Sequence, residues 1–241
     1  MTAIQTKDLT KNYGDVAAVD GLSLSVDEGE LFALLGVNGA GKTTTLKMLS
    51  CLTKPSGGDA FLLGNSILVD SLKIKQILNL SPQETAVAPN LSVRENLEFI
   101  AGIYGQNGKS AKQNADRMAE QFELTPILNK KAKTLSGGMQ RRLSIAMALI
   151  SNPEILFLDE PTLGLDVLAR RELWTAIRSL KGRVTIILTT HYMEEVEALS
   201  DRIGIMAHGR LLAVGTAAEM KAQTATDTLE DAFISIAGGV Q

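Results

Sequence analysis

The sequence predicts an α/β fold in which helices cover a parallel sheet that carries an inserted all-helical segment. Three observations predict this fold. Short apolar runs bounded by turn residues recur along the 241 residues and do not alternate apolar with polar positions, which is typical of strands buried on both faces. Helical patterns separate these runs, as in a parallel sheet. Between Pro82 and Pro153 the strand-like runs stop and helical periodicity replaces them, which predicts an insert of about 70 residues.

Three apolar runs are the predicted core strands, and each ends at a glycine or a polar residue. The carboxyl ends of parallel strands are where ligands bind in open α/β sheets, so the residues after each run are candidate site residues. A helix from Lys42 to about Leu52 is predicted after the first run. The three predicted strands are Leu31–Leu35, Ile155–Leu158 and Val184–Thr190.

The insert begins with a helix-capping signal. Ser92 and Glu95 form a capping box, and Val93, Leu97, Ile100 and Tyr104 then share one helix face. A loop at residues 105–109 precedes a second helix through Phe122, and a third helix is predicted to begin near Gly137.

The C-terminal segment predicts an amphipathic helix. Leu229, Ala232, Phe233 and Ile236 follow the i, i+3, i+4, i+7 spacing, and Gly238 with Gly239 marks the expected stop. Packing on its own domain is favoured over binding to a partner. We therefore expect one domain, 1–241, with an α/β core at 1–82 and 151–220, a helical subdomain at 83–150 and a tail at 221–241.

Composition excludes several classes of protein. Hydrophobic residues make up 45% of the chain and charged residues 21%, which predicts a soluble globule rather than a disordered chain. The net charge of −3 gives no electrostatic basis for nucleic-acid binding. The single cysteine, Cys51, is expected to be a buried thiol and suits a reducing compartment. Residues 1–9 lack the apolar run of a secretory signal, and no run approaches the ~18 residues of a membrane span.

A glycine-rich loop follows the first predicted strand. Residues 36–43 fit the pattern G-x-x-x-x-G-K-T and lie between a strand and a helix, as phosphate binding requires. The backbone N–H groups of such a loop turn inward around phosphate oxygens, and the helix directs its positive end at them. Lys42 is expected to bridge the β- and γ-phosphates, and Thr43 to offer its hydroxyl to Mg²⁺. A glycine-rich turn with a solvated lysine is the alternative.

Two carboxylates end the second predicted strand. Asp159 is expected at the ligand-binding edge of the sheet, where it can hold Mg²⁺ directly or through water. Glu160 projects differently and can orient and deprotonate a water molecule in line with the γ-phosphate. A solvated corner of the fold is the alternative interpretation.

Ser136, Gly137 and Gly138 open the third helix of the insert. Ser136 is a good N-cap, and the two glycines leave the helix N-terminus free of side chains, which makes a second anion site. Because the chain already has one phosphate-facing helix start, we infer that this second one closes over the nucleotide of another subunit.

Four further residues are candidate ligands. Gln83, at the junction of core and insert, is positioned to touch Mg²⁺ or the attacking water, although a lone glutamine is usually a surface residue. His191 ends a strand on the same sheet edge as Asp159 and is assigned to the γ-phosphate. Tyr13 can stack on an adenine face. Asp166 is either a site residue or only a helix N-cap.

Taken in order, these residues resemble the nucleotide-binding subunit of an ABC transporter. The signature is the most specific match, because other phosphate-loop ATPases lack it. The matched segments are Tyr13 of the aromatic loop, Gly36–Thr43 of Walker A, Gln83 of the Q-loop, Leu135–Gln140 of the signature, Asp159 and Glu160 of Walker B, Asp166 of the D-loop and His191 of the switch.

The resemblance implies a P-loop NTPase core with an N-terminal antiparallel β subdomain and an inserted all-helical subdomain. It implies ATP and Mg²⁺ as the bound groups. The implied catalytic residues are Glu160, His191 and Gln83, and the implied metal ligands are Thr43, Gln83 and Asp159. The implied nucleotide-binding residues are Tyr13, Gly36, Asn38, Gly39, Ala40, Gly41, Lys42, Thr43, Thr44, Ser136, Gly137, Gly138 and Asp166.

The resemblance also implies partners. Two such subunits, identical or similar, dimerise head to tail around ATP, and hydrolysis drives a separate membrane permease at the cytoplasmic face of the cell membrane. The residues at 39–45, 136–142 and 228–233 resemble bacterial exporters with ABC-2 type permeases, which include sodium and multidrug exporters. Leu163 departs from the usual small or polar residue at its position. No direct contact with cargo and no nucleic-acid partner are expected.

A second function stays open at this point. Soluble ABC-type ATPases act on ribosomes or nucleic acid, but they usually carry two cassettes or a long coiled coil within the insert. A slowly hydrolysing regulator is a third possibility, and Glu160 argues against it.

Overall fold

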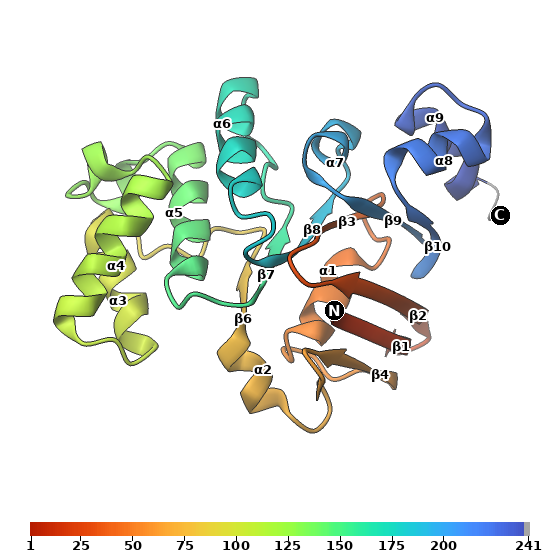
Figure 1. Cartoon of the computed structure of the whole chain (residues 1–241), viewed down its shortest axis with the longest axis horizontal. Coiled ribbons are helices and arrows are strands. Elements are labelled where there is room, and N and C mark those ends of the chain that lie inside the picture. The colour runs from red at the N-terminus through yellow and green to blue at the C-terminus, as the bar shows by residue number, and fades with distance from the viewer. Residues whose placement is uncertain (239–241) are drawn as a thin grey trace.

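The computed structural model describes residues 1–238, in which two sheets occupy the middle of the molecule and helices lie at both ends (Figure 1). The elements in chain order are β1 (Thr2–Tyr13), β2 (Val16–Asp27), β3 (Leu31–Leu35), α1 (Lys42–Leu49), β4 (Gly57–Leu62), β5 (Asn65–Ser66), α2 (Ser71–Ile77), β6 (Leu78–Ser81), α3 (Val93–Ile103), α4 (Gly108–Gln121), η1 (Thr125–Ile127), η2 (Ala132–Thr134), α5 (Gly137–Leu149), β7 (Ile155–Asp159), α6 (Val167–Arg178), β8 (Thr185–Thr190), α7 (Met193–Leu199), β9 (Arg202–Ala207), β10 (Arg210–Gly215), α8 (Ala217–Thr224) and α9 (Leu229–Gly238).

The larger sheet has the strand order β10-β9-β3-β8-β7-β6, and all its neighbours are parallel except β10 and β9. The smaller sheet is antiparallel, with the order β2-β1-β4-β5. The predicted α/β class and the antiparallel β subdomain are therefore confirmed. In the parallel register Leu35 pairs with Thr190, and Asp159 pairs with Thr189. The residues that follow β3, β7 and β8 consequently meet at one edge.

Strand β3 is buried on both of its faces. Phe32 and Leu34 pack with α1 and the antiparallel sheet, while Ala33 and Leu35 pack with α7, α8 and α9. A fully buried side chain of this size contributes roughly 1.5–3 kcal/mol by leaving water. This two-sided burial explains why the run is apolar at every position, and it fixes the loop that follows at the sheet edge.

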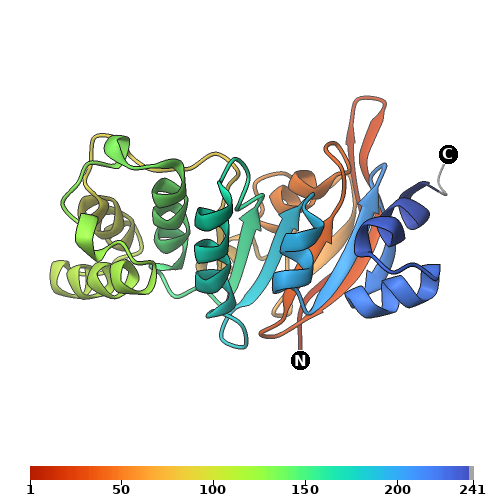
Figure 2. The ribbon, with the colours of Figure 1, turned by 90° about the horizontal axis from the view of Figure 1, so that it is seen from above.

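The helices α3, α4 and α5 form the end of the molecule opposite α8 and α9, as the view from above shows (Figure 2). The predicted capping box is confirmed, since Ser92 Oγ accepts from the amide of Glu95 at 3.2 Å and Glu95 Oε2 accepts from the amide of Ser92 at 2.7 Å. Val93 and Leu97 are buried as predicted. Tyr104 lies just past the helix end and is 41% exposed, so it does not complete the buried face.

Helix α1 ends at Leu49, three residues before the predicted end near Leu52. The reason is local: Ser50 is the C-cap, and Cys51 has a φ of 55°, in the left-handed region that cannot continue a right-handed helix. The Cys51 thiol is only partly buried, which corrects the expected fully buried one. Strand β8 begins at Thr185, so Val184 lies outside it.

The C-terminal helix packs on its own chain. Leu229, Ala232 and Phe233 are buried in one cluster with residues of β9, α7 and α8, which supports the packing interpretation over partner binding. Helix α8 extends across the expected tail boundary at residue 221, and Gly239 lies outside the described residues. Within residues 1–238, no helix combines the length and the apolar character that a membrane crossing demands.

Candidate functional site

The glycine-rich loop connects β3 to α1 at the carboxyl edge of the larger sheet. Its first residue, Gly36, donates its amide to the carbonyl of Thr190 at 3.3 Å, which ties the loop to the end of β8. Gly41 has a φ of 102°, and a Cβ there would lie 2.5 Å from the carbonyl oxygen of Ala18. Only glycine satisfies both constraints, because other residues are strained in this conformation and would collide with backbone. The loop is thus held in a compact turn over the start of α1.

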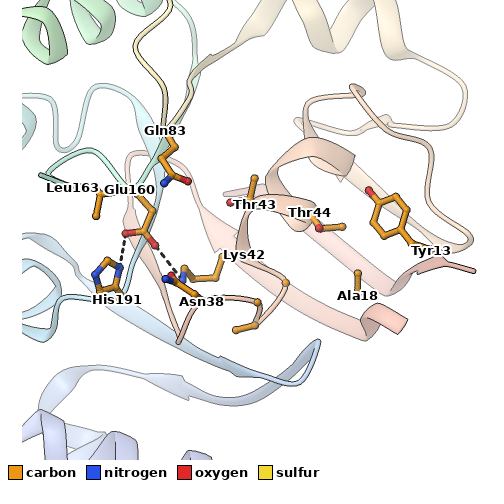
Figure 3. Close-up of a pocket in the computed structure, with 13 residues that line it drawn as sticks. Tyr13, Ala18, Asn38, Lys42, Thr43, Thr44, Gln83, Glu160, Leu163 and His191 are labelled. Carbon is orange, nitrogen blue, oxygen red and sulfur yellow. Dashed lines mark hydrogen bonds and ion pairs between the residues drawn. The ribbon is translucent and has the colours of Figure 1, made fainter. Parts of the chain in front are cut away.

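A cavity of about 440 Å³ lies over this loop. Figure 3 shows residues from four parts of the chain pointing into it: Lys42 of α1, Gln83 after β6, Glu160 after β7 and His191 after β8. Most of the residues predicted to bind nucleotide line it. The lining residues are Tyr13, Ala18, Asn38, Gly39, Ala40, Gly41, Lys42, Thr43, Thr44, Gln83, Glu160, Leu163 and His191.

The Lys42 ammonium is buried at the floor of the cavity. Its Nζ donates to the carbonyl of Gly36 at 2.7 Å and to that of Val37 at 3.3 Å, and it lies 3.1 Å from Glu160 Oε1. Only 6% of each side chain of the Lys42–Glu160 pair is exposed. A buried charge needs both a counter-charge and hydrogen-bond acceptors, and Lys42 has both. The solvated-lysine alternative is therefore wrong.

Glu160 sits between Lys42 and His191. Its second oxygen, Oε2, lies 2.8 Å from Nδ1 of His191 (Figure 3). Its backbone adopts a φ of 47°, a left-handed conformation that is uncommon outside glycine, and its amide donates to both the carbonyl and the hydroxyl of Thr189 at 3.1 Å. Such strained backbone is held only by its surroundings and is concentrated at functional sites. The strain turns the Glu160 carboxylate away from Asp159 and into the cavity.

Asp159 does not line the cavity itself but lies directly behind it, 4% exposed. Its Oδ1 accepts from the hydroxyl of Thr43 at 3.1 Å and from that of Thr189 at 2.5 Å. The Thr43 hydroxyl, the Asp159 carboxylate and the nearby Gln83 amide offer the hard oxygen donors that Mg²⁺ prefers. Within residues 1–238 there is no group of three or more His, Cys, Asp or Glu side chains that could hold a metal ion. The Thr43–Asp159 contact fits the chemistry of a Mg²⁺ site.

Tyr13 lies at the opposite end of the cavity from Glu160 (Figure 3) and is 51% exposed. Its ring face carries the Lys11 ammonium, 5.1 Å from the ring centroid. An exposed aromatic face at the mouth of a phosphate-binding cavity is suited to stacking on a flat base.

The predicted signature and D-loop residues do not reach this cavity. Ser136 and Gly137 are exposed, and Ser136 Oγ caps α5 by accepting from the amide of Met139 at 3.3 Å. Asp166 caps α6, accepting from the amide of Ala169 at 2.9 Å, so the N-cap interpretation is confirmed for the isolated chain. The second helix start is thus free to meet another molecule.

Ala18, Thr189 and Arg141 of this region were not predicted from the sequence, and Leu163 was noted only as a departure from the usual residue at its position. Ala18 and Leu163 line the cavity, and Thr189 holds both Asp159 and Glu160. Arg141 is 4% exposed and donates to backbone carbonyls around the site. A signal for Arg141 was present, because it shares a helix face with the buried Ile145 and an arginine on an apolar face needs acceptors.

Comparisons with known proteins agree with this geometry. The family model described as ABC transporter matches residues 19–163. The "Probable multidrug ABC transporter ATP-binding protein YbhF" of Escherichia coli is 44% identical over 98% of this chain, which spans only 42% of that protein. The daunorubicin/doxorubicin resistance ATP-binding protein DrrA of Streptomyces peucetius is 38% identical over 94% of this chain and 69% of its own length. The linearmycin resistance ATP-binding protein LnrL of Bacillus subtilis is 40% identical over 96% of this chain and 75% of its own length.

Two solved structures show the same fold. An ATP-binding subunit of an ABC transporter superposes with a TM-score of 0.86 at 27% identity and covers 98% of this chain and 99% of its own. A dimeric ATP-binding cassette in a post-hydrolysis state, bound to ADP and Pi, has a TM-score of 0.79 at 26% identity. The match covers 88% of this chain and 98% of that cassette. The fold, the cavity over the glycine-rich loop and the matched family model together establish that this chain belongs to the ABC transporter family, as an ATP-binding cassette.

Proposed function

We propose that this chain binds ATP between itself and a second copy, or a similar subunit, and hydrolyses it to drive export through a separate membrane permease of ABC-2 type. One observation carries the proposal: Lys42, Glu160 and His191 meet in one cavity, while the capped start of α5 at Ser136 is exposed outside it. The chain therefore has a phosphate site with hydrolytic groups, and a second phosphate-binding helix start that its own cavity does not use.

In the proposed binding step, the inward-facing amides of residues 36–43 and the Lys42 ammonium hold the β- and γ-phosphates, and Tyr13 stacks on the adenine. Thr43, Asp159 and Gln83 would hold Mg²⁺, which supplies positive charge to the phosphates when bound. The Thr43–Asp159 contact at 3.1 Å supports this assignment, because it brings the two predicted ligands together.

In the proposed hydrolytic step, Glu160 orients a water molecule toward the γ-phosphate and accepts its proton. His191 holds the Glu160 carboxylate from the other side, as the 2.8 Å contact supports. Because His191 also lines the cavity, its ring would donate a hydrogen bond to the γ-phosphate. Gln83, on the loop that leads into the helical segment, touches the metal or the attacking water. Its position supports the transfer of a change at the γ-phosphate to residues 83–150.

The dimer is proposed to bring Ser136, Gly137 and Gly138 of one copy over the nucleotide held by the other, with Asp166 beside them. The amides at the start of this 13-residue helix carry partial positive charge. Ser136 caps the amide of Met139, whereas the amides of Gly137 and Gly138 have no hydrogen-bond acceptor within residues 1–238. A related cassette that is dimeric with bound ADP and Pi supports the same assembly.

The transport partner is proposed from the relatives, whose names describe multidrug, daunorubicin/doxorubicin and linearmycin resistance. We propose that this chain docks on a permease at the cytoplasmic face of the membrane and powers export of a drug-like molecule that it does not itself contact. The relatives favour this function over a soluble ATPase acting on ribosomes or nucleic acid. The neighbouring reading frames test it, since a permease gene should lie among them.

The decisive experiment uses Glu160→Gln, which keeps the shape of the side chain and removes the proton acceptor. With Mg²⁺ and ATP the variant should accumulate as a dimer by light scattering, and its turnover should fall by about 10²- to 10⁴-fold. The control is Glu194→Gln on α7, because the Glu194 side chain is 80% exposed. This substitution should leave both dimer formation and turnover unchanged. A cross-linker placed at residue 136 should then reach the nucleotide of the other copy.

Two outcomes would contradict the proposal. If Glu160→Gln stays monomeric at every ATP and protein concentration, the shared-nucleotide dimer is wrong. If it turns over ATP at the wild-type rate, Glu160 is not the proton acceptor.

A further inference from the structure

Arg141 is a buried arginine on α5, five residues after Ser136, and none of the predicted functions uses it. Its guanidinium reaches two separate loop segments. Nη1 donates to the carbonyls of Pro82 and Gln83, the latter at 3.2 Å. On the other side, Nη2 donates to the carbonyl of Asp159 at 2.6 Å and Nε to that of Pro161 at 2.8 Å. One side chain therefore joins the segment before the helical insert to the turn that carries Glu160.

These contacts are the main polar anchors of the first segment. Within residues 1–238, no turn or loop hydrogen bond between backbone groups involves residues 82–87. The Glu160 turn has its own support from Thr189, but its carbonyls at positions 159 and 161 point to Arg141. The backbone position of Gln83 thus depends on Arg141, whereas the strands of the sheet are held by hydrogen bonds to one another.

Burying the charge of Arg141 costs desolvation free energy, which argues that this side chain does more than fill space in the core. Arg141 is 4% exposed and pairs with no carboxylate at ion-pair distance within residues 1–238. Burial lowers the pKa of Arg141 to about 10, while the nearby Asp159, Glu195 and Glu160 favour its charged form. It therefore remains charged at neutral pH, held by carbonyl dipoles and by the negative field of the site. A leucine or methionine would fill this space without the desolvation cost.

We propose that Arg141 is a positioning residue for hydrolysis: it fixes the backbone of Gln83 and the turn of Glu160 to α5, so that the start of α5 and both residues move together. The proposal rests on the function proposed above. Five residues of helix rise about 7.5 Å, so Arg141 lies within one and a half turns of Ser136. When the start of α5 meets nucleotide on the other copy, the guanidinium carries that contact to the two side chains nearest the attacking water.

The test uses Arg141→Lys and Arg141→Gln in the full chain. Lysine keeps the charge but offers one compact ammonium, which cannot span four carbonyls on two segments, and glutamine removes the charge. The matched control is Arg142→Lys, because Arg142 is the next residue of the same helix and pairs with Glu123 and Glu172 on the surface. Melting temperatures are measured first, and turnover is measured where every variant is fully folded.

Both Arg141 variants should lose kcat by about 10- to 100-fold, because small misplacements of reacting groups cost that much. The affinity for ATP in EDTA should stay near that of the wild type, since Lys42 and the loop are untouched. Hydrogen exchange should speed up at the amides of Ala88, Glu160 and Leu163, which donate to Asn96, Thr189 and Glu160, in both variants and not in Arg142→Lys. If glutamine prevents folding, lysine decides the question alone.

Wild-type kcat per folded molecule in Arg141→Lys, or unchanged exchange at the amides of Ala88, Glu160 and Leu163, would overturn the proposal. An equal loss of kcat in Arg142→Lys would also overturn it, because the effect would then belong to the helix as a whole. Failure of the proposed function is distinguishable: the wild-type chain would then show no MgATP turnover or dimer, and hydrogen exchange would still report on Arg141.

Discussion

The carboxylate of Glu160 lies 3.1 Å from the ammonium of Lys42, and both side chains are almost fully buried. The chain thus pairs the cation proposed to bind phosphate with the carboxylate proposed to accept the proton. An incoming γ-phosphate competes with Glu160 for Lys42, because both are anions and Lys42 is the nearest ammonium. We therefore expect nucleotide binding to release the Glu160 carboxylate from Lys42.

Glu160→Gln should therefore bind ATP more tightly than the wild type even as a monomer. The substitution removes both the competing anion and its repulsion of the γ-phosphate, which should strengthen binding several-fold. Equilibrium titration of ATP in EDTA measures this, at protein concentrations where light scattering shows that both proteins stay monomeric. Weaker binding than in the wild type would show that the ion pair does not compete with phosphate.

Lys42→Ala should weaken ATP binding by about 10- to 100-fold, since a hydrogen bond to a charged group is worth roughly 1.5–3 kcal/mol. The matched control is Lys47→Ala on the same helix, whose side chain is exposed. The affinity of Lys47→Ala for ATP should equal that of the wild type. Equal affinities in both variants would mean that Lys42 does not contact phosphate.

Gly41→Ala should disrupt the phosphate-binding loop much more than Gly39→Ala. Both positions have positive φ, but only at Gly41 would the new Cβ meet backbone, 2.5 Å from the carbonyl oxygen of Ala18, whereas nothing lies within 4 Å at Gly39. Gly39→Ala should therefore cost only conformational strain of about 1 kcal/mol. Melting temperature and ATP affinity measured for both variants should separate the two effects, and equal losses would refute the steric argument.

Glu195→Gln should stabilise the protein increasingly as pH rises. Glu195 is fully buried beside Trp174, and burial raises the pKa of its carboxyl above the ordinary 4.5, with repulsion from Glu160 adding to the effect. A raised pKa means that the folded state holds the proton more tightly than the unfolded state. Wild-type stability is therefore lost as pH rises from about 4.5 through the folded pKa. Glutamine does not ionise at these pH values, so the variant does not lose stability by burying a charged carboxylate.

Melting temperatures of wild type and Glu195→Gln should converge near pH 4.5 and diverge toward neutral pH, with the variant higher. Glu197→Gln on the same helix is the control, since its side chain is 44% exposed. A constant difference between Glu195→Gln and wild type at all pH values would contradict the assignment of a raised pKa.

Ser92→Ala should lower the free energy of unfolding by about 1 kcal/mol, because it leaves the Glu95 amide at the start of α3 without its acceptor. Ser92→Gly should cost only a few tenths of a kcal/mol, since glycine is tolerated as an N-cap. Urea denaturation compares the two variants. The opposite order would mean that the capping box does not stabilise α3.

Much of the fold was predictable because local signals agreed with the final packing. The apolar run at 31–35 is a strand because both faces are buried, and the capping box at Ser92 begins α3 as its spacing predicts. Errors were confined to ends, such as α1, where the left-handed Cys51 stops the helix. Helical periodicity in a sequence does not show where a residue other than glycine adopts the left-handed conformation that ends a helix.

The sequence by itself determined the chemistry that is available to this protein. Walker A, the paired acids and the signature are contiguous patterns, so their residue types and order are readable without a structure. Only the tertiary structure decided which groups touch. It turned Glu160 toward Lys42 and Asp159 toward Thr43, although the two acids are neighbours in the chain.

Tertiary structure also placed Arg141 against the backbone of four residues from two distant loops. The physical reason is that these contacts depend on sheet register, on a strained backbone angle and on carbonyl groups, which every residue carries alike. A motif records side-chain types, whereas a carbonyl cluster becomes visible only once the chain has folded around it.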